Sequence, residues 1–267
     1  MNKLLSQPII LIGRYAIQLA TETARLLVHV ARLFQLIVET LCRIHLAYKN
    51  IGMSIEQMFN LGVQSIPLVI PVSIFIGAEV VLQANFQFSG IIPLKFLGVA
   101  ASKTIISEFA PVFTSIIVAG RVATSIAAEI SNMQASEQLD AMYCLNLDPI
   151  RYLVVPRVIG CVVMLPALVV LAGLIAIVSS IFTVGMYVKI PLGQYIASLG
   201  LYFDIKDVIV TIGKTVLFAF SMGILGIYQG LASQKSATGV GKATSSSIMS
   251  VCGAILLIDC LVNIVLL

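Results

Sequence analysis

The sequence has very few charged residues. Asp, Glu, Lys and Arg make up only 10% of its 267 residues, whereas soluble domains carry about 25%. Hydrophobic residues account for 59% of the chain, and its mean hydropathy is +1.06. So few charges cannot cover a surface exposed to water, so we predict an integral membrane protein. The net charge of +4 is small and does not indicate nucleic-acid binding.

The chain also lacks the motifs of several enzyme classes. Its two histidines, His29 and His45, precede the first apolar span, and no HExxH occurs, which argues against an intramembrane zinc protease. The GxSxG of serine hydrolases is missing, and GVGKAT at 239–244 lacks the first glycine of a Walker A loop. The five cysteines show no CxxC spacing. We therefore predict no catalytic residue, no metal site and no cofactor bound by this chain.

Polar side chains near the N-terminus recur with the α-helical period. Their mean spacing of about 3.6 residues, with apolar residues between them, predicts an amphipathic helix over 14–50 that lies in the membrane interface. A cytosolic helix packed on a partner is the alternative. The polar stripe consists of Arg14, Gln18, Glu22, Arg25, His29, Arg32, Gln35, Glu39 and Arg43.

Five apolar segments follow, and each is close to the ~20 residues that cross a bilayer. With five spans, the N-terminal helix, the loop after the second span and the loop after the fourth share one side of the membrane. That side carries six, three and two basic residues, against three on the other side, so we predict that it faces the cytoplasm or a plastid stroma. The predicted fold is one all-α membrane domain over 1–267. Its spans are 61–82, 96–118, 158–184, 208–228 and 248–267.

Four of the five spans contain ionisable residues, which are costly inside a bilayer and should face protein, water or a polar ligand. Lys103, Lys214 and Asp259 fit either internal ion pairs or positions near lipid headgroups. For Glu79 and Glu108 the prediction is a polar cavity.

A polar segment interrupts the apolar sequence between the second and third spans. Residues 127–148 contain neither proline nor glycine before Asp148-Pro149, which predicts a helix that ends there, because the residue before proline avoids the α conformation. Such a charged helix is either a solvated loop or a docking element, and its length alone does not distinguish the two.

Residues 119–157, AGRVATSIAAEISNMQASEQLDAMYCLNLDPIRYLVVPR, resemble the signature block of the MlaE/YrbE-type permease family. Three further segments are similar to the same family: IFIGAEVVLQ at 74–83, SEFAPVFTSIIVAGR at 107–121, and SATGVGKATSSSIMSVCGAILLIDCLVNIVL at 236–266. Members of this family are membrane subunits of ABC transporters that move phospholipids and work with MCE-domain proteins.

The resemblance implies that 127–148 is a coupling helix that docks on a separate ATPase subunit, which binds ATP and Mg²⁺. The candidate contacts are Glu129, Glu137, Gln138, Asp140, Asp148 and Arg151. It also implies a homodimer with a central lipid cavity and an MCE-domain partner. The cavity candidates are Glu79, Gln83, Lys103 and Glu108. Many relatives carry Arg where this chain has Ser107, and Lys103, one turn away, is the candidate replacement for that charge.

Two other functions remain open from the residues alone. An ion-coupled secondary transporter would use Glu79, Glu108 and Asp259 as ion sites, and a non-transporting scaffold would use none of them. The composition fits a bacterial inner membrane, such as a cyanobacterial one, or a plastid inner envelope membrane.

Overall fold

The computed structural model describes residues 23–24, 27–45, 51–88, 96–188, 190–200 and 204–266. Within these residues every regular element is helical, and five helical segments are long and apolar enough to cross a membrane. This confirms the predicted all-α membrane fold. The segments are Ile51–Phe88, Leu97–Ala135, Ile150–Tyr187, Ile205–Leu231 and Ala237–Val265.

The first three spans are interrupted helices, and each is longer than its predicted apolar segment. The first joins α2 (Ile51–Leu61) to α3 (Ile66–Phe88) through a 3-10 turn. The second joins α4 (Leu97–Thr104) to α5 (Ala110–Ala135) through a π-turn at Ile105–Phe109. The third begins with a π-turn at Ile150–Val154 and continues as α7 (Val155–Tyr187). Polar residues extend these helices past the apolar sequence because helix formation does not require hydrophobic side chains.

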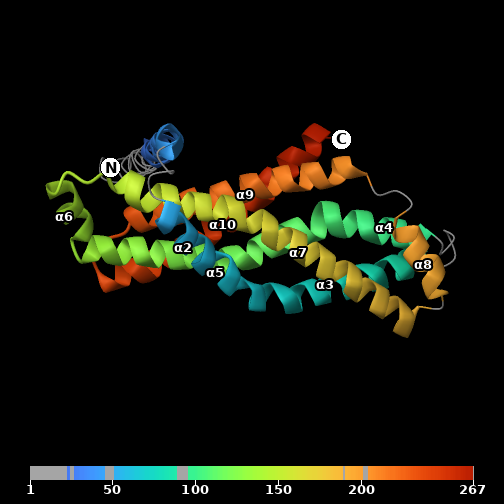
Figure 1. The fold of residues 1–267 in the computed structure, drawn as a ribbon. Coiled ribbons are helices and arrows are strands. Elements are labelled where there is room, and N and C mark those ends of the chain that lie inside the picture. Colours follow the sequence, from blue (N-terminus) through green and yellow to red (C-terminus); the bar gives the residue numbers. More distant parts are fainter. Residues whose placement is uncertain are drawn as a thin grey trace, which may run out of the picture.

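The last two spans are α9 (Ile205–Leu231) and α10 (Ala237–Leu266). Helix α5 lies at the centre of the bundle and packs against α10, α9 and α7, while α3 packs on the outer side of α7 (Figure 1). The short α6 (Gln138–Cys144) and α8 (Leu192–Leu199) lie at opposite ends of the bundle.

Small residues allow α9 to approach α5 closely. Ala119, Ala123 and Ala127 recur every fourth residue on the buried face of α5. A Cβ added at Gly226 would lie 3.3 Å from the carbonyl oxygen of Ala123, and one at Gly230 would lie 2.7 Å from Cβ of Ile130. Such contacts between small residues are the usual means of helix association in a bilayer.

The segment predicted as one helix over 127–148 is divided in the structure. Helix α5 continues to Ala135, and the chain then turns at Glu137, whose φ of 59° is left-handed, before α6 begins. A second left-handed residue, Asn146, ends the segment after α6. The left-handed conformation costs a residue such as Glu roughly 1–2 kcal/mol, so packing rather than local preference sets the break at Glu137. The segment therefore consists of two helices joined by a turn, with α6 lying across the end of the bundle (Figure 1), and we call it the hairpin.

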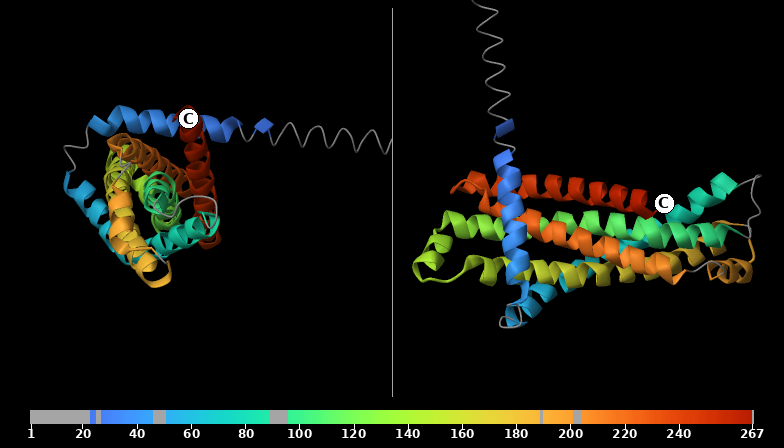
Figure 2. Two further views of the ribbon diagram at one scale, coloured as in Figure 1. Left: turned by 90° about the vertical axis from the view of Figure 1, so that its right-hand side faces the viewer. Right: turned by 90° about the horizontal axis from the view of Figure 1, so that it is seen from above.

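The N-terminal helix is described over 27–43 and crosses the bundle steeply near its α6 end (Figure 2). Leu27, Val30, Phe34 and Leu41 are exposed on it, whereas Leu36 is buried against the core. This orientation and exposed apolar face support a position in the membrane interface, which remains a prediction. The first residues of the predicted helix, 14–22, and its last, 46–50, lie outside the described residues.

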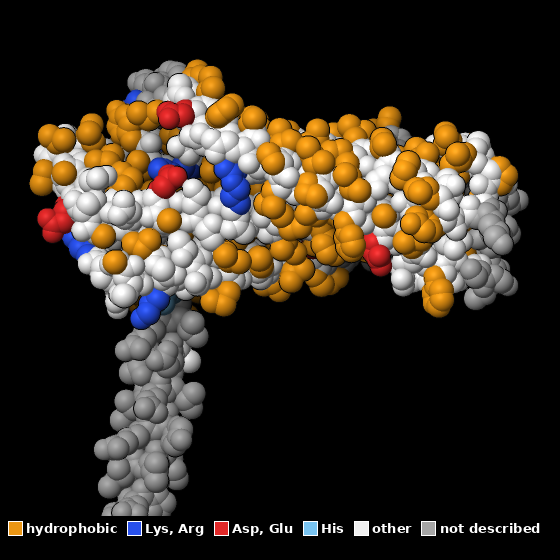
Figure 3. All heavy atoms as spheres, turned by 90° about the horizontal axis from the view of Figure 1, so that it is seen from below, with side chains coloured by type: hydrophobic (Ala, Val, Ile, Leu, Met, Phe, Trp, Pro, Cys, Tyr) orange, Lys and Arg blue, Asp and Glu red, His pale blue; other side chains and the backbone are white. Residues whose placement is uncertain are grey.

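The surface shows the distribution expected of a membrane protein. In Figure 3, hydrophobic side chains cover the middle of the bundle, and most of the charged side chains in view gather toward the α6 end. Exposed large hydrophobic residues occur on all the long helices, which is where lipid replaces water as the solvent.

Gly77 is expected to be essential for the contact between α3 and α7. A Cβ at this position would meet the backbone of Ala176, which cannot move aside as a flexible side chain would. Gly77→Ala should therefore destabilise the bundle by about 1–3 kcal/mol. The measurement is the temperature at which buried Cys161 becomes reactive to a maleimide dye, in a chain whose other cysteines are serine.

Gly253 provides the matched control, because an added Cβ there has no neighbour within 4 Å. Gly253→Ala should leave the transition unchanged or raise it, since alanine favours helix by up to about 1 kcal/mol. Equal transitions for Gly77→Ala and wild type would show that α3 and α7 do not pack as described.

Candidate functional site

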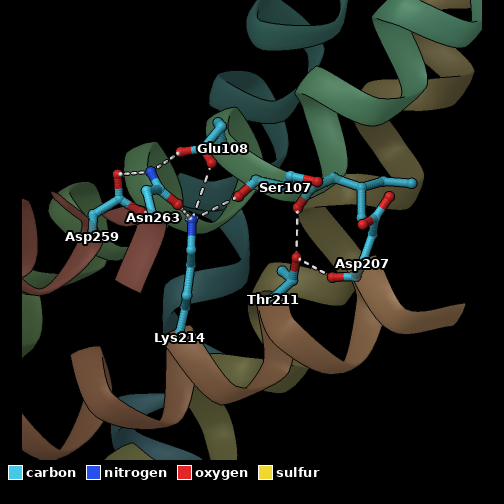
Figure 4. Close-up of polar contacts among 8 residues, drawn as sticks. Ser107, Glu108, Asp207, Thr211, Lys214, Asp259 and Asn263 are labelled. Carbon is cyan, nitrogen blue, oxygen red and sulfur yellow. Dashed lines mark hydrogen bonds and ion pairs between the residues drawn. The ribbon is translucent and has the colours of Figure 1, made fainter. Parts of the chain in front are cut away.

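A buried lysine joins three of the spans. The side chain of Lys214 on α9 is only 2% exposed, and its Nζ lies 3.1 Å from Glu108 Oε1 and 3.1 Å from Asp259 Oδ1. The same ammonium donates hydrogen bonds to Asn263 Oδ1 and, at 3.4 Å, to the carbonyl oxygen of Ser107. Figure 4 shows Lys214 pointing from α9 into the space between these groups. We call Glu108, Lys214, Asp259 and Asn263 the Lys214 cluster.

Asn263 completes the cluster by binding both carboxylates. Its Nδ2 donates to Glu108 Oε2 at 3.2 Å and to Asp259 Oδ2 at 3.4 Å. Asp259 and Asn263 are four residues apart and therefore share one face of α10. The cluster holds one cation and two carboxylic acids. The side chain of Glu108 is 40% exposed, so the cluster is open on that side.

The π-turn at 105–109 positions Glu108. A π-turn adds a residue to the helix and disturbs the regular pattern of backbone hydrogen bonds, and such turns often occur at functional sites. Here side chains of α9 bind its carbonyl groups. Thr211 Oγ1 donates to the carbonyl oxygen of Ile106 at 3.1 Å, and Lys214 binds that of Ser107 (Figure 4). The π-turn, α9 and α10 thus form one hydrogen-bonded unit.

The four predicted cavity residues differ in their exposure and partners. Glu79 and Gln83 are both exposed on α3. The side chain of Lys103 is 64% exposed and lies 3.6 Å from Asp207. Only Glu108 belongs to the Lys214 cluster, and the cation beside it comes from α9 rather than from Lys103. Sequence reasoning missed Asn263, although its spacing of four from Asp259 on an apolar helix was a usable signal.

At the α6 end, three of the predicted coupling acids form ion pairs within the chain. Glu129 Oε2 lies 2.9 Å from Nη2 of Arg157, which is nearly buried. Asp148 Oδ2 lies 2.7 Å from Nε of Arg43 on the N-terminal helix. These two pairs fix the base of the hairpin to α7 and to the N-terminal helix.

The third pair lies on the surface of the hairpin. Asp140 Oδ2 accepts a hydrogen bond of 2.6 Å from Lys235 Nζ, and both side chains are well exposed. This hydrogen bond raises the pKa of Lys235 above its usual value. Exposed pairs of this kind contribute little to stability. Because both side chains are exposed, a partner can reach them.

The other predicted coupling residues differ in exposure. Glu137 and Gln138 are exposed at the start of α6, whereas Arg151 is half-buried in the second π-turn. Two large apolar side chains stand beside the polar ones: Tyr143 is 66% exposed and Leu145 is 71% exposed. We call Glu137, Gln138, Asp140, Tyr143 and Leu145 the α6 tip. Its mixture of charged and apolar exposed groups is typical of a protein-docking surface.

The family model for Permease MlaE matches residues 54–265. The chain belongs to the MlaE permease family. It is 36% identical over 201 residues to a probable ABC transporter permease protein of Rickettsia typhi, a match that covers 75% of this chain and 77% of the relative. The probable ABC transporter permease protein ycf63 of Pyropia yezoensis is 30% identical over 225 residues, covering 84% and 86%. One of Synechocystis sp. is 34% identical over 203 residues, covering 74% and 75%.

This membership confirms the resemblance in the sequence, and it makes the chain an ABC transporter permease. An MlaE permease is a multi-pass integral membrane protein, in agreement with the five apolar spans. A permease of this class implies an ATPase partner that supplies the energy. The match begins at residue 54, so the N-terminal helix lies outside it.

Replacing Lys214 by methionine should destabilise the protein strongly. The variant leaves Glu108 and Asp259 close together without a cation, and the loss of one partner of a buried pair costs about 3–5 kcal/mol. The triple variant Lys214→Met/Glu108→Gln/Asp259→Asn removes all three charges and should recover most of that loss. The temperature at which Cys161 becomes reactive measures both effects, and a wild-type transition in Lys214→Met would contradict the described cluster.

Proposed function

We propose that this MlaE permease moves phospholipids as a homodimer, energised by an ABC ATPase that docks on the α6 tip. The observation that carries the proposal is the separation of two polar sites along one bundle. The exposed α6 tip lies at one end of the bundle (Figure 1). The Lys214 cluster lies between the membrane-spanning helices, away from that end (Figure 4). Helix α5 connects them directly, because it begins beside Glu108 and ends beside the tip.

The mounting of the hairpin supports a coupling role. The pairs Glu129–Arg157 and Asp148–Arg43 attach its base to α7 and to the N-terminal helix. A force applied to the α6 tip is therefore transmitted to the bundle rather than lost in a mobile loop. In this proposal the candidates divide into two groups: Glu137, Gln138 and Asp140 contact the ATPase, while Glu129 and Asp148 position the hairpin.

The surface of α10 supports a homodimer. In the most apolar part of α10, only 11% is buried within the protomer, compared with 39–50% in the same part of the other four spans. Leu256, Leu257, Leu261 and Ile264 are all exposed on it. In the proposed dimer this face meets a second copy or the lipid path between copies. The open side of Glu108 then gives a polar contact for a headgroup, and an MCE-domain partner would accept the lipid at the end opposite α6.

The ion-coupled alternative gains no support from the site. Glu108 and Asp259 are both bound by Lys214, and Glu79 is exposed on a different helix. The proposed location is a bacterial inner membrane or a plastid inner envelope membrane, which suits relatives such as those of Rickettsia typhi, Synechocystis sp. and Pyropia yezoensis.

Charge reversal at the α6 tip tests the docking role. We expect Glu137→Lys/Asp140→Lys to lower the amount of co-purified ATPase, and ATP-driven phospholipid transfer in vesicles, by about tenfold or more, equivalent to about 1.4 kcal/mol of binding. Glu56→Lys, at an exposed acid on α2, should have no effect.

A swap distinguishes docking from the internal pair with Lys235. Asp140→Lys/Lys235→Asp keeps an ion pair on the hairpin but reverses both charges at the surface. If Asp140 contacts the ATPase, the swap remains defective. If both the swap and Glu137→Lys/Asp140→Lys bound the ATPase as well as wild type does, the α6 tip would not be the docking site.

A further inference from the structure

An apolar cavity of about 150 Å³ lies in the seam between α7 and α9, with the π-turn behind it. Its floor includes Ala110, Val169 and Thr215, which are buried, and its rim includes the exposed Val170 and Leu174. The lining is almost entirely hydrocarbon. A cavity of this kind on a membrane-spanning surface is accessible to the acyl chains of the bilayer.

Gly173 keeps the cavity open. It lines the cavity from α7, and a Cβ added there would have only Ala110 Cβ within 4 Å, at 3.9 Å. No packing contact therefore requires glycine at this position. A larger side chain would extend into the empty volume.

A small polar recess adjoins the cavity. Ile106 and Val208 line both, so the two spaces are neighbours. The recess is otherwise lined mainly by polar groups: Ser102, Lys103, Ser107, Asp204 and Asp207. It lies at the start of α9, whereas the apolar cavity extends along α9 from Val208 to Thr215.

The two spaces follow the polarity of a bilayer leaflet. Thr215 comes seven positions after Val208 on α9, which is about 10 Å at a rise of 1.5 Å per residue. The charged groups lie at the beginning of a membrane-spanning helix, where headgroups are found, and the apolar part lies deeper, where acyl chains are found. This order of charged and apolar groups along α9 therefore matches one lipid with its headgroup at the surface, over the recess.

The charges of the recess select the type of headgroup. Among the residues that the structure describes, Lys103 is the one cation that lines it, while Asp204 and Asp207 contribute two carboxylates. Asp207 lies 3.6 Å from Lys103, and Asp204 also caps α9 by accepting from the backbone N–H of Lys206. A purely anionic headgroup would meet an excess of negative charge. A headgroup with both phosphate and ammonium would pair with both signs.

We propose that this seam binds a zwitterionic phospholipid of the surrounding bilayer. Its acyl chain fills the apolar cavity beside Gly173, its phosphate contacts Lys103, and its ammonium group contacts Asp204 and Asp207. The site is distinct from the Lys214 cluster and is formed within a single protomer. It requires only that the chain spans a membrane, and does not depend on which cargo the transporter moves.

Photo-crosslinking of the full-length chain tests this site. The protein is reconstituted in vesicles that contain phosphatidylethanolamine with a diazirine in its acyl chain, irradiated, and mapped by mass spectrometry. We expect adducts at the rim residues Val170, Leu174 and Ile212. Gly173→Leu should lower their yield at least fivefold, whereas Gly213→Leu, on α9 with no neighbour within 4 Å of its added Cβ, should leave the yield unchanged.

Two further arms make the result decisive. Val170→Trp covers the rim without entering the core, so it should reduce the yield even if Gly173→Leu fails to fold. Unlabelled phosphatidylethanolamine should compete better than phosphatidylglycerol, and Lys103→Ala should weaken that competition. Equal labelling of wild type and both blocked variants would show only general contact with lipid and overturn the site. Stronger competition by phosphatidylglycerol would overturn the zwitterionic headgroup.

Discussion

The packing of the spans in the half of the bundle away from α6 depends on the ammonium group of Lys214. An isolated buried charge is very unfavourable, so this lysine requires its partners to stay within hydrogen-bond distance. Those partners come from the π-turn before α5 and from the last turns of α10. The relative positions of three spans are therefore fixed at one point. If α10 moves relative to α9, a charged hydrogen bond must break; otherwise the three spans must move as one unit.

Helix α5 extends this constraint to the opposite end. Its 26 residues span about 39 Å, from the residue after the π-turn to the start of the hairpin. At that end Glu129 is held by Arg157, and Asp148 by Arg43. The hairpin and the Lys214 cluster are thus attached to the same helix, as the proposed coupling of docking to transport needs.

Hydropathy was sufficient to predict the fold class and the five spans, because a bilayer demands long apolar helices whatever their packing.

The site was less predictable. Lys214, Glu108 and Asp259 were recognised as unusual, but their pairing depends on helix crossings that a linear sequence does not contain. Pro111 follows the π-turn directly and has no N–H to bond the carbonyl of Ser107, but this signal alone does not show that Lys214 binds there instead. Nothing in the sequence around Glu137 indicates that the chain turns there between two helices. Asn263 escaped notice because it carries no charge. From its spacing Lys103 was the candidate replacement for a positive charge missing at Ser107, and the structure places it 3.6 Å from Asp207.

In the proposed function the ATPase docks on the hairpin at the α6 end, and the native cysteines allow this docking to be tested. Cys144 ends α6 and Cys260 lies on the membrane-spanning part of α10, and both are exposed. Single-cysteine chains are assembled with the ATPase in membranes and treated with a short thiol-to-amine crosslinker. We expect a covalent permease–ATPase product from Cys144 and none from Cys260. An active complex that gives no product from Cys144, or gives one from Cys260, would contradict this docking.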